Sequence, residues 1–211
     1  SNSDGLPRDG NWDAVTFGYA RDMNPNERWL EERLMALEES EECVVTASGV
    51  SAINGTFLAL LSAGDHIICS DVAYISVRTM LLEHFPKRLG IETTLLDTSD
   101  PELVQAAIQP NTKLIHIETP GNPTTRISDI AVIAQIAHAH GALLSVDSTW
   151  SGLTTQRPLA LGADLVMHSI TKYVNGHGDA LGGAVFGSKA LLDKIRVFVV
   201  KDLGACISPF N

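Results

Sequence analysis

The chain has 211 residues, 45% of them hydrophobic, and a formal net charge of −10 at pH 7. This hydrophobic fraction argues against a disordered protein, and the negative charge disfavours nucleic acid and anionic membrane surfaces as partners. No apolar run approaches the roughly 20 residues of a membrane-spanning helix. The length suits one large domain with a single buried core.

Apolar runs alternate with helix-like segments, which is the pattern of βαβ units. Strands are predicted at residues 43–46, 66–70, 92–97, 113–118, 143–147, 165–168 and 183–186. The predicted fold class is therefore α/β, a three-layer α/β/α domain with a mostly parallel sheet of about seven strands.

The helices between these strands have readable ends. Asn24-Pro25, followed by Glu27, predicts a capped helix start, and Asp100-Pro101 predicts another. A third helix is predicted from residue 128 to 140, ending at Gly141. In the first helix, we expect the face formed by Leu30, Leu34 and Leu37 to point into the core.

Ser48-Gly49 follows the first predicted strand and precedes a helix-like stretch that continues to Leu61. A glycine at such a junction lets backbone N–H groups approach an anion, and the helix N-terminus adds a favourable dipole. The dipole contributes only about 0.3–1 kcal/mol at exposed sites, so side-chain donors should share the task. We predict a phosphate cradle here; the alternative is an ordinary helix cap.

Asp147 ends the apolar run of residues 143–147. Buried parallel strands deliver side chains to the carboxyl edge of a sheet, where ligands bind. We therefore predict that this carboxylate serves a ligand. The alternative is a cap on the following helix.

The most informative segment runs from residue 168 to 179. Lys172 lies just past an apolar run, Ser169 and Thr171 precede it, and a glycine-rich loop follows. Because ammonium groups are costly to desolvate, a lysine at the end of a buried strand suggests that the amine itself reacts. It would serve as a Schiff-base nucleophile, with burial and neighbouring charge favouring its neutral form. The alternative is a surface lysine in a polar loop.

Pyridoxal phosphate (PLP) enzymes need a lysine, a carboxylate for the ring nitrogen and an anion cradle. The three segments supply these groups, so PLP is the predicted cofactor. A Rossmann dinucleotide site is the fold-level rival, but it needs Gly-x-Gly-x-x-Gly after the first strand, and nothing after Val45 supplies it.

The three cysteines, Cys43, Cys69 and Cys206, show neither disulfide nor zinc-ligand spacing, and no metal site is predicted. Cys43 and Cys69 lie in apolar runs. We expect them to be small core residues in a reducing compartment, which favours the cytoplasm.

Together these segments resemble the PLP-dependent enzymes of cysteine and methionine metabolism, the transsulfuration family. The family includes cystathionine γ-synthase, cystathionine γ-lyase, cystathionine β-lyase and methionine γ-lyase. The resemblance follows nearly the whole chain in order after its first dozen residues. The matching segments are Tyr19-Ala20-Arg21 with Asn24-Pro25; Ser48-Gly49-Val50, where the family usually has Ser-Gly-Met; Gly64-Asp65 with Tyr74; Glu118-Thr119-Pro120-Gly121-Asn122-Pro123; Asp147 in Val-Asp-Ser-Thr-Trp; and Ser169-Ile170-Thr171-Lys172-Tyr173.

The resemblance implies catalytic roles for three residues. Lys172 is expected to carry PLP as an aldimine and to act as general base. Asp147 is expected to pair with the protonated ring nitrogen. Tyr74 is expected to stack on the ring and to help protonate the leaving group; its alternative is a core or interface aromatic.

The resemblance also implies a cofactor-binding set. Asn122 is expected to contact the phenolic oxygen of PLP. Tyr19 and Arg21 are expected to reach the phosphate of a neighbouring subunit, so a homodimer or homotetramer is predicted; the alternative is an exposed arm. The remaining members of the predicted set are Ser48, Gly49, Val50, Glu118, Ser169 and Thr171.

We predict two parts: an N-terminal arm with the first helix (1–40) and a PLP-binding large domain (41–211). In the family, a smaller C-terminal domain carries the arginine for the substrate carboxylate, and we expect this domain to be absent from the chain. Ser1-Asn2 is typical of a cloning remnant. The chain is therefore expected to be a piece of a longer protein.

The expected activity is a carbon–sulfur lyase that performs β- or γ-elimination on cystathionine or methionine. Position 76 is a cysteine in methionine γ-lyases, but here it is Ser76, so the thiol specialisation is unsupported. One alternative is γ-replacement, as in cystathionine γ-synthase or an O-acylhomoserine sulfhydrylase. Another is a cofactor-binding or oligomerisation domain without turnover.

Overall fold

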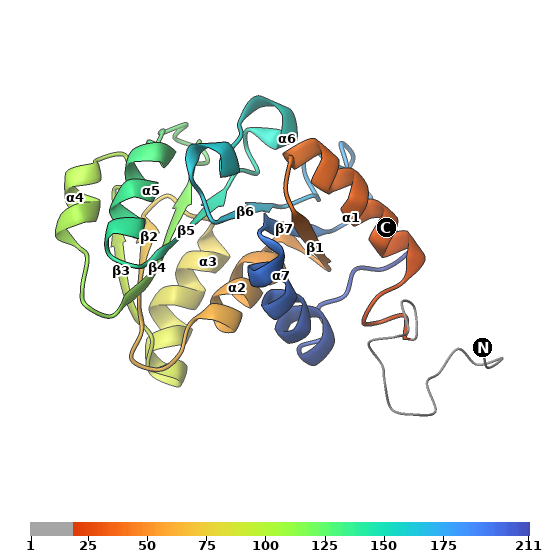
Figure 1. Ribbon diagram of the computed structural model, residues 1–211, viewed down its shortest axis with the longest axis horizontal. Helices are drawn as coiled ribbons and strands as arrows, with labels where there is room; N and C mark the ends of the chain where they lie inside the picture. The colour runs from red at the N-terminus through yellow and green to blue at the C-terminus, as the bar shows by residue number, and fades with distance from the viewer. Residues whose placement is uncertain (1–18) are drawn as a thin grey trace.

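A computed structural model describes residues 19–211 of the chain, which form one sheet between two layers of helices (Figure 1). The strands are β1 (Glu42–Thr46), β2 (His66–Ser70), β3 (Glu92–Leu96), β4 (Thr112–Glu118), β5 (Leu143–Asp147), β6 (Leu165–His168) and β7 (Gly183–Gly187). Every predicted strand is present, and each end lies within one residue of its predicted position.

The seven strands are ordered β1-β7-β6-β5-β4-β2-β3. Strands β2 to β6 pair in parallel, whereas β7 runs antiparallel to both of its neighbours, β1 and β6. The predicted three-layer, mostly parallel architecture is confirmed. The carboxyl ends of β4, β5 and β6 therefore meet at one edge of the sheet, which is where ligands bind in such folds.

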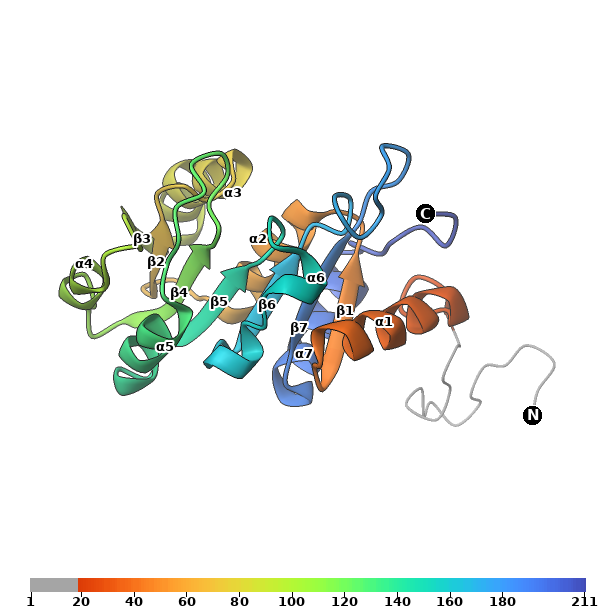
Figure 2. The ribbon, with the colours of Figure 1, turned by 90° about the horizontal axis from the view of Figure 1, so that it is seen from above.

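Helices cover both faces of the sheet, as Figures 1 and 2 show from two directions. One face carries α1 (Pro25–Glu38), α4 (Pro101–Ala106), α5 (Ile130–Ala139) and α6 (Gly152–Thr155), and the 3₁₀ turn η3 (Leu159–Leu161) packs on the same core. The other carries α2 (Gly49–Leu60), α3 (Ile75–Thr79) continuing into the π-helix η2 (Met80–Leu89), and α7 (Lys189–Ile195) continuing into the π-helix η4 (Arg196–Asp202). Alternate strand residues such as Val44 and Val45 fall into the two separate cores, because strand side chains alternate between faces.

Two helical predictions need correction. The helix predicted from residue 128 is α5, and it begins later: Asp129 is its N-cap and accepts a hydrogen bond from the Val132 N–H at 3.1 Å. Ser128 is instead tied to Thr98 by a buried hydroxyl contact of 2.8 Å. Leu37 was predicted to face the core but is 46% exposed.

The reason for the error at Leu37 is the charged inner face of α1. The buried residues of this helix are Glu27, Glu31, Leu34 and Glu38, so Leu37 lies off the inward stripe. Glu31 can be buried because the Arg196 guanidinium donates hydrogen bonds to both of its carboxylate oxygens, at 2.8 and 2.9 Å. Hydrophobic periodicity alone gives no signal for a helix that buries paired charges.

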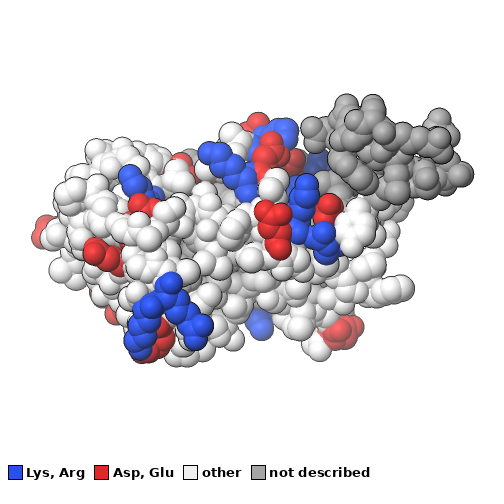
Figure 3. Space-filling model, turned by 90° about the horizontal axis from the view of Figure 1, so that it is seen from below, with Lys and Arg blue, Asp and Glu red and all other residues white. Residues whose placement is uncertain are grey.

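Three further features concern the cysteines, the helices and the surface of the described residues. Cys43 and Cys69 are buried and unpaired, as predicted. Within residues 19–211, no helix has both the length and the apolarity to cross a membrane. On the face in Figure 3, outside the part covered by grey residues, acidic and basic side chains lie beside one another among uncharged surface.

Candidate active site

A cavity of about 840 Å³ opens where β4, β5 and β6 end and α2 begins. It brings together residues that are up to 133 positions apart in the sequence, from Ser48 to Leu181. Ten of the predicted site residues line it: Ser48, Gly49, Val50, Tyr74, Glu118, Asn122, Asp147, Ser169, Thr171 and Lys172.

Asp147 ends β5 at the base of the cavity and is only 6% exposed. One carboxylate oxygen, Oδ1, accepts hydrogen bonds from the Thr149 N–H at 3.0 Å and the Thr149 hydroxyl at 2.6 Å. Burial raises the pKa of Asp147 above its ordinary value, while the bonds from Thr149 oppose this effect. The helix-cap alternative does not hold, since α6 begins at Gly152 with Ser151 in the N-cap position.

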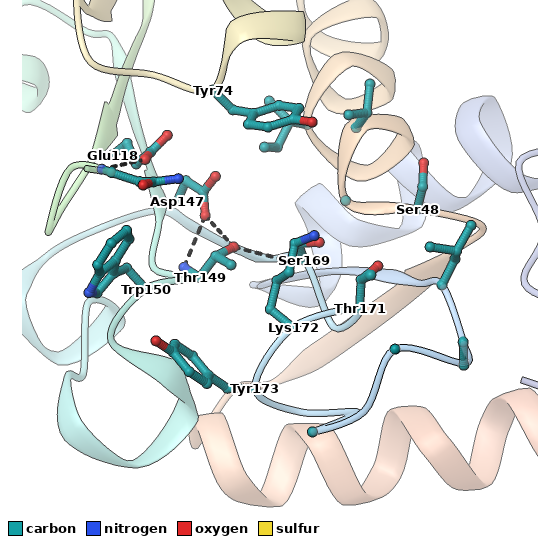
Figure 4. Close-up of a pocket in the computed structure, with 18 of the residues that line it drawn as sticks. Ser48, Tyr74, Glu118, Asp147, Thr149, Trp150, Ser169, Thr171, Lys172 and Tyr173 are labelled. Atoms are coloured by element: carbon teal, nitrogen blue, oxygen red, sulfur yellow. Dashed lines mark hydrogen bonds between the residues drawn. The ribbon is translucent and has the colours of Figure 1, made fainter.

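Thr149 joins Asp147 to the loop that follows β6. Its hydroxyl oxygen accepts a hydrogen bond from the Ser169 N–H at 2.8 Å. An amide N–H can only donate, so the single proton of the hydroxyl is directed to Asp147, as the dashed lines in Figure 4 trace. No role was predicted for Thr149, although it lies two residues after Asp147 in the segment Val-Asp-Ser-Thr-Trp.

Glu118 is a second buried carboxylate, 7% exposed, and it pairs in register with Asp147 across the parallel strands. Its Oε1 accepts a hydrogen bond from the Asn122 N–H at 3.0 Å. Burial, together with the nearby charge of Asp147, raises the pKa of Glu118 to about 7. The base of the cavity therefore holds two carboxylates, and within residues 19–211 neither forms an ion pair.

The N-terminus of α2 forms another part of the cavity. Ser48 and Ser51 make a reciprocal capping box, with N–H to hydroxyl distances of 3.0 and 3.1 Å. The N–H groups of Gly49 and Val50 keep no partner among the described residues, as is usual in a first helical turn. They are free to bind an anion.

Gly49 also lets the helix approach the loop after β6. A Cβ at this position would lie 2.6 Å from the Cβ of Ser169, so no larger residue fits without displacement. Thr171, by contrast, directs its hydroxyl at the backbone of Gly182, whose N–H it accepts at 3.0 Å. Ser169 thus lies against the helix N-terminus, while Thr171 braces the loop.

Lys172 lies in a turn after β6 and not in the strand itself. Its N–H donates to the Ser169 carbonyl at 3.0 Å, and its carbonyl accepts from the Gly176 N–H at 2.8 Å. The side chain is exposed where it lines the cavity, so the predicted burial of the amine is wrong for this chain. Its ammonium group has no hydrogen-bond or ion-pair partner within the described residues.

Aromatic side chains line the cavity from opposite sides. Tyr74 immediately precedes α3, is 48% exposed, and in Figure 4 lies across the site from Trp150 and Tyr173. Trp150 and Tyr173 also line the cavity, although the sequence analysis gave them no role. Their only signal was adjacency to Thr149 and Lys172 in the motifs.

Tyr19 and Arg21 do not line the cavity. They precede α1, where the Arg21 guanidinium lies 5.0 Å from the centre of the Tyr19 ring and donates to the Lys201 carbonyl. Their predicted contact with a neighbouring subunit's phosphate stays a prediction. Most of the predicted N-terminal arm lies outside the described residues.

Comparison with known proteins gives a consistent family assignment. Residues 5–211 match the family described as Cys/Met metabolism PLP-dependent enzyme, which confirms the predicted resemblance. A canavanine γ-lyase of Pseudomonas canavaninivorans is 48% identical, with 92% of this chain and 48% of that protein covered. An O-succinylhomoserine sulfhydrylase of Pseudomonas aeruginosa is 44% identical, with 92% and 47% covered.

A solved structure agrees with the fold. The crystal structure of metB from Corynebacterium glutamicum superimposes with a TM-score of 0.88 at 38% identity, covering 93% of this chain and 51% of that chain. The chain spans about half the length of the curated relatives described above.

The cavity fits PLP, the cofactor of this family. The buried residue Asp147 leaves one carboxylate oxygen without a hydrogen-bond partner among the described residues, which suits a protonated ring nitrogen. The free N–H groups of Gly49 and Val50 suit a phosphate, and the amine of Lys172 suits an aldehyde. These three features open into the same cavity.

Proposed function

Because this chain belongs to the family of Cys/Met metabolism PLP-dependent enzymes, we propose that the protein containing it is a γ-lyase of amino acids. Such an enzyme breaks the bond between Cγ and a sulfur or oxygen leaving group. One observation carries the proposal: the Lys172 amine, the Asp147 carboxylate and the free N–H groups of α2 share one cavity. When bound, PLP supplies the electron sink that stabilises negative charge on the substrate carbons.

Asp147 keeps the ring nitrogen of the cofactor protonated. Thr149 fixes one carboxylate oxygen through two hydrogen bonds, so the other oxygen is left for the ring nitrogen. The low exposure of Asp147 strengthens this charge–charge contact because water screens it little. A neutral residue here could not hold the proton at that nitrogen.

Lys172 would hold the aldehyde carbon of the cofactor; once the substrate's amino group has replaced it there, the freed amine would be placed to take the proton from the substrate Cα. Its exposure in the cavity leaves the amine accessible to both tasks. Gly49 and Val50 bind the phosphate through their N–H groups, with the Ser169 hydroxyl beside them. Tyr74 would stack on the ring, and its phenol would supply a proton for the leaving group.

Tyr19 and Arg21 complete the phosphate site of a second subunit in this proposal. Their position outside the cavity of their own chain supports such an exchange, and an arginine suits bidentate phosphate contact. Arg21→Ala should then weaken PLP binding in a dimer, measured by titration alongside light scattering. Full cofactor affinity in a monomer would contradict this part of the proposal.

The relatives support elimination but leave the leaving group open. The canavanine γ-lyase is named for a substrate in which oxygen is bonded to Cγ, whereas our sequence-based expectation was cleavage of a carbon–sulfur bond. The sulfhydrylase has similar identity, so replacement by an external thiol is the second candidate. Sulfur and oxygen substrates must therefore be compared directly.

The experiment uses the longest protein that carries this chain, loaded with PLP. It is incubated with canavanine, methionine or cystathionine alone, and with O-succinylhomoserine plus cysteine or sulfide. A γ-lyase releases hydroxyguanidine from canavanine or a thiol from the sulfur substrates without an added nucleophile, and Lys172→Ala abolishes this release. Thioether or thiol formation only in the last mixture would establish replacement instead. Cofactor binding without any product would overturn the enzymatic proposal.

A further inference from the structure

Arg126 lies outside the cavity but links neighbouring segments that form one of its walls. It belongs to the loop between β4 and α5, four residues after Asn122. Its guanidinium forms ion pairs with Asp71, which follows β2, and with Asp97, which follows β3; the Asp97 contact measures 2.7 Å. One side chain thus joins three segments that are distant in sequence.

The Asp97 end of this link is rigid. Its Oδ1 accepts hydrogen bonds from the Ser99 hydroxyl at 2.6 Å and the Ser99 N–H at 2.9 Å, which leaves Oδ2 for Arg126. The bonds from Ser99, with the charge of Arg126 adding to them, hold the pKa of Asp97 below its ordinary value. Asp97 is therefore a fixed, ionised anchor for the guanidinium.

The Asp71 end fixes the segment that leads to Tyr74. This segment packs directly on the Asn122 loop: a Cβ at Gly121 would lie 2.5 Å from Cγ2 of Val72. The loop closes on itself as well, since the Gly121 N–H donates to the Arg126 carbonyl at 2.9 Å. Arg126 therefore binds, through backbone and side chain, both of the segments that meet there.

Tyr74 is positioned through its backbone. Its side chain makes no hydrogen bond within the described residues, and about half of it is exposed. The position of its ring therefore depends on its backbone. On one side α3 holds it, since the Val77 N–H donates to the Tyr74 carbonyl at 2.9 Å; on the other side are residues 71–73, which the Arg126–Asp71 ion pair restrains. Asn122 is likewise exposed on its loop.

We infer that Arg126 is a positioning residue, which holds the Tyr74 and Asn122 segments together on one wall of the cavity. This inference rests on the proposed function, in which Tyr74 stacks on the PLP ring and Asn122 contacts it. A guanidinium suits the task because its planar fork reaches two carboxylates at once. Loss of the link lets the stacking tyrosine move relative to the base of the cavity.

The test compares variants of the longest protein that carries this chain. Arg126→Gln should weaken PLP binding about tenfold and reduce the circular dichroism of the cofactor band, because misplaced contact groups lose most of their effect. Arg126→Lys should restore part of both signals, since it keeps the charge but not the fork. Asp71→Asn should reproduce the loss, and the double variant should be no worse than Arg126→Gln. Lys189→Gln, which breaks a surface ion pair of 2.7 Å with Asp193, is the matched control and should change neither signal.

Several results would overturn the inference. These are unchanged PLP affinity and dichroism in Arg126→Gln, equal losses in the Lys189→Gln control, or an undiminished effect of Arg126→Gln in a Tyr74→Ala background. The inference would also be refuted if the loss of PLP affinity and dichroism occurred only near the melting temperature of the variant and were absent at temperatures well below it. Such a result would show that Arg126 merely stabilises the fold. Failure of the unaltered protein to bind PLP would instead refute the proposed function, so the two failures are distinguishable.

Discussion

Two buried polar clusters in this molecule differ in how their charges are compensated. In the first, between α1, β1 and η4, Arg196 binds both oxygens of Glu31, and Arg28 binds Glu42 at 2.9 Å. In the second, at the ends of β4 and β5, Glu118 and Asp147 lie in register and form no ion pair with the residues described. Both clusters remove carboxylates from water, yet only the first supplies the cations.

This difference in charge compensation distinguishes a cluster that stabilises the fold from one that can bind a ligand. Burying a charge costs free energy unless a partner compensates it, so a buried, internally paired cluster can serve the fold alone. A buried carboxylate pair that faces a cavity and lacks a cation marks the place of a positively charged ligand group. In the proposed function, the protonated ring nitrogen of PLP would meet that need at Asp147.

The largest expected effect is on the paired cluster. Arg196→Met removes the cation that binds both oxygens of buried Glu31 and leaves it only a longer contact with Arg28, at 3.4 Å. The variant should lower the free energy of unfolding by about 3–5 kcal/mol in urea titrations. Replacing both residues by apolar ones should recover most of that loss. A decrease below about 1 kcal/mol for the single variant would show that this cluster does not hold the fold.

The unpaired cluster should respond in the opposite way. Asp147→Asn should lower turnover at least about 100-fold, because it removes charge stabilisation at the cofactor. The free energy of unfolding without PLP should not fall, since no internal ion pair is lost. Asp193→Asn on the surface is the control, and normal turnover in Asp147→Asn would rule out the proposed role.

Glu118 provides a smaller, pH-dependent test in the absence of PLP. Its pKa is raised from 4.5 to about 7, so the folded protein retains a proton that the unfolded chain has released. The stability from this group is fully present below the unfolded pKa and is lost as pH rises through the folded one. Between about pH 5.5 and 8, the unfolding free energy of Glu118→Gln should therefore gain about 2 kcal/mol relative to the unaltered protein. Parallel pH profiles would show that Glu118 is not perturbed.

The sequence predicted the sheet well because strand cores are local apolar runs with clear turn signals. It did not predict that β7 runs antiparallel, since strand direction depends on the path of the chain and not on composition. The π-helical continuations η2 and η4 were also missed, as was the charged inner face of α1. In α1, a tertiary partner 165 residues away, Arg196, determines which side chains are buried.

In the candidate site, too, local motifs could be predicted from the sequence, whereas contacts between distant residues could not. Asp147 and Lys172 stand at recognisable places in local motifs, and the structure puts both in one cavity. Thr149 and Arg126 act through partners that only the fold brings near: Ser169 for the former, Asp71 and Asp97 for the latter. The Lys172 amine was predicted to be buried but is exposed, because Lys172 lies in the turn after β6 and lines the cavity, not the core.

The most direct test of the account is to identify the residue that carries the cofactor. The longest protein containing this chain is loaded with PLP, reduced with borohydride, digested and analysed by mass spectrometry. We predict a pyridoxyl group on Lys172, with no labelled peptide in Lys172→Ala. A pyridoxyl group on another lysine, or undiminished labelling in Lys172→Ala, would contradict it.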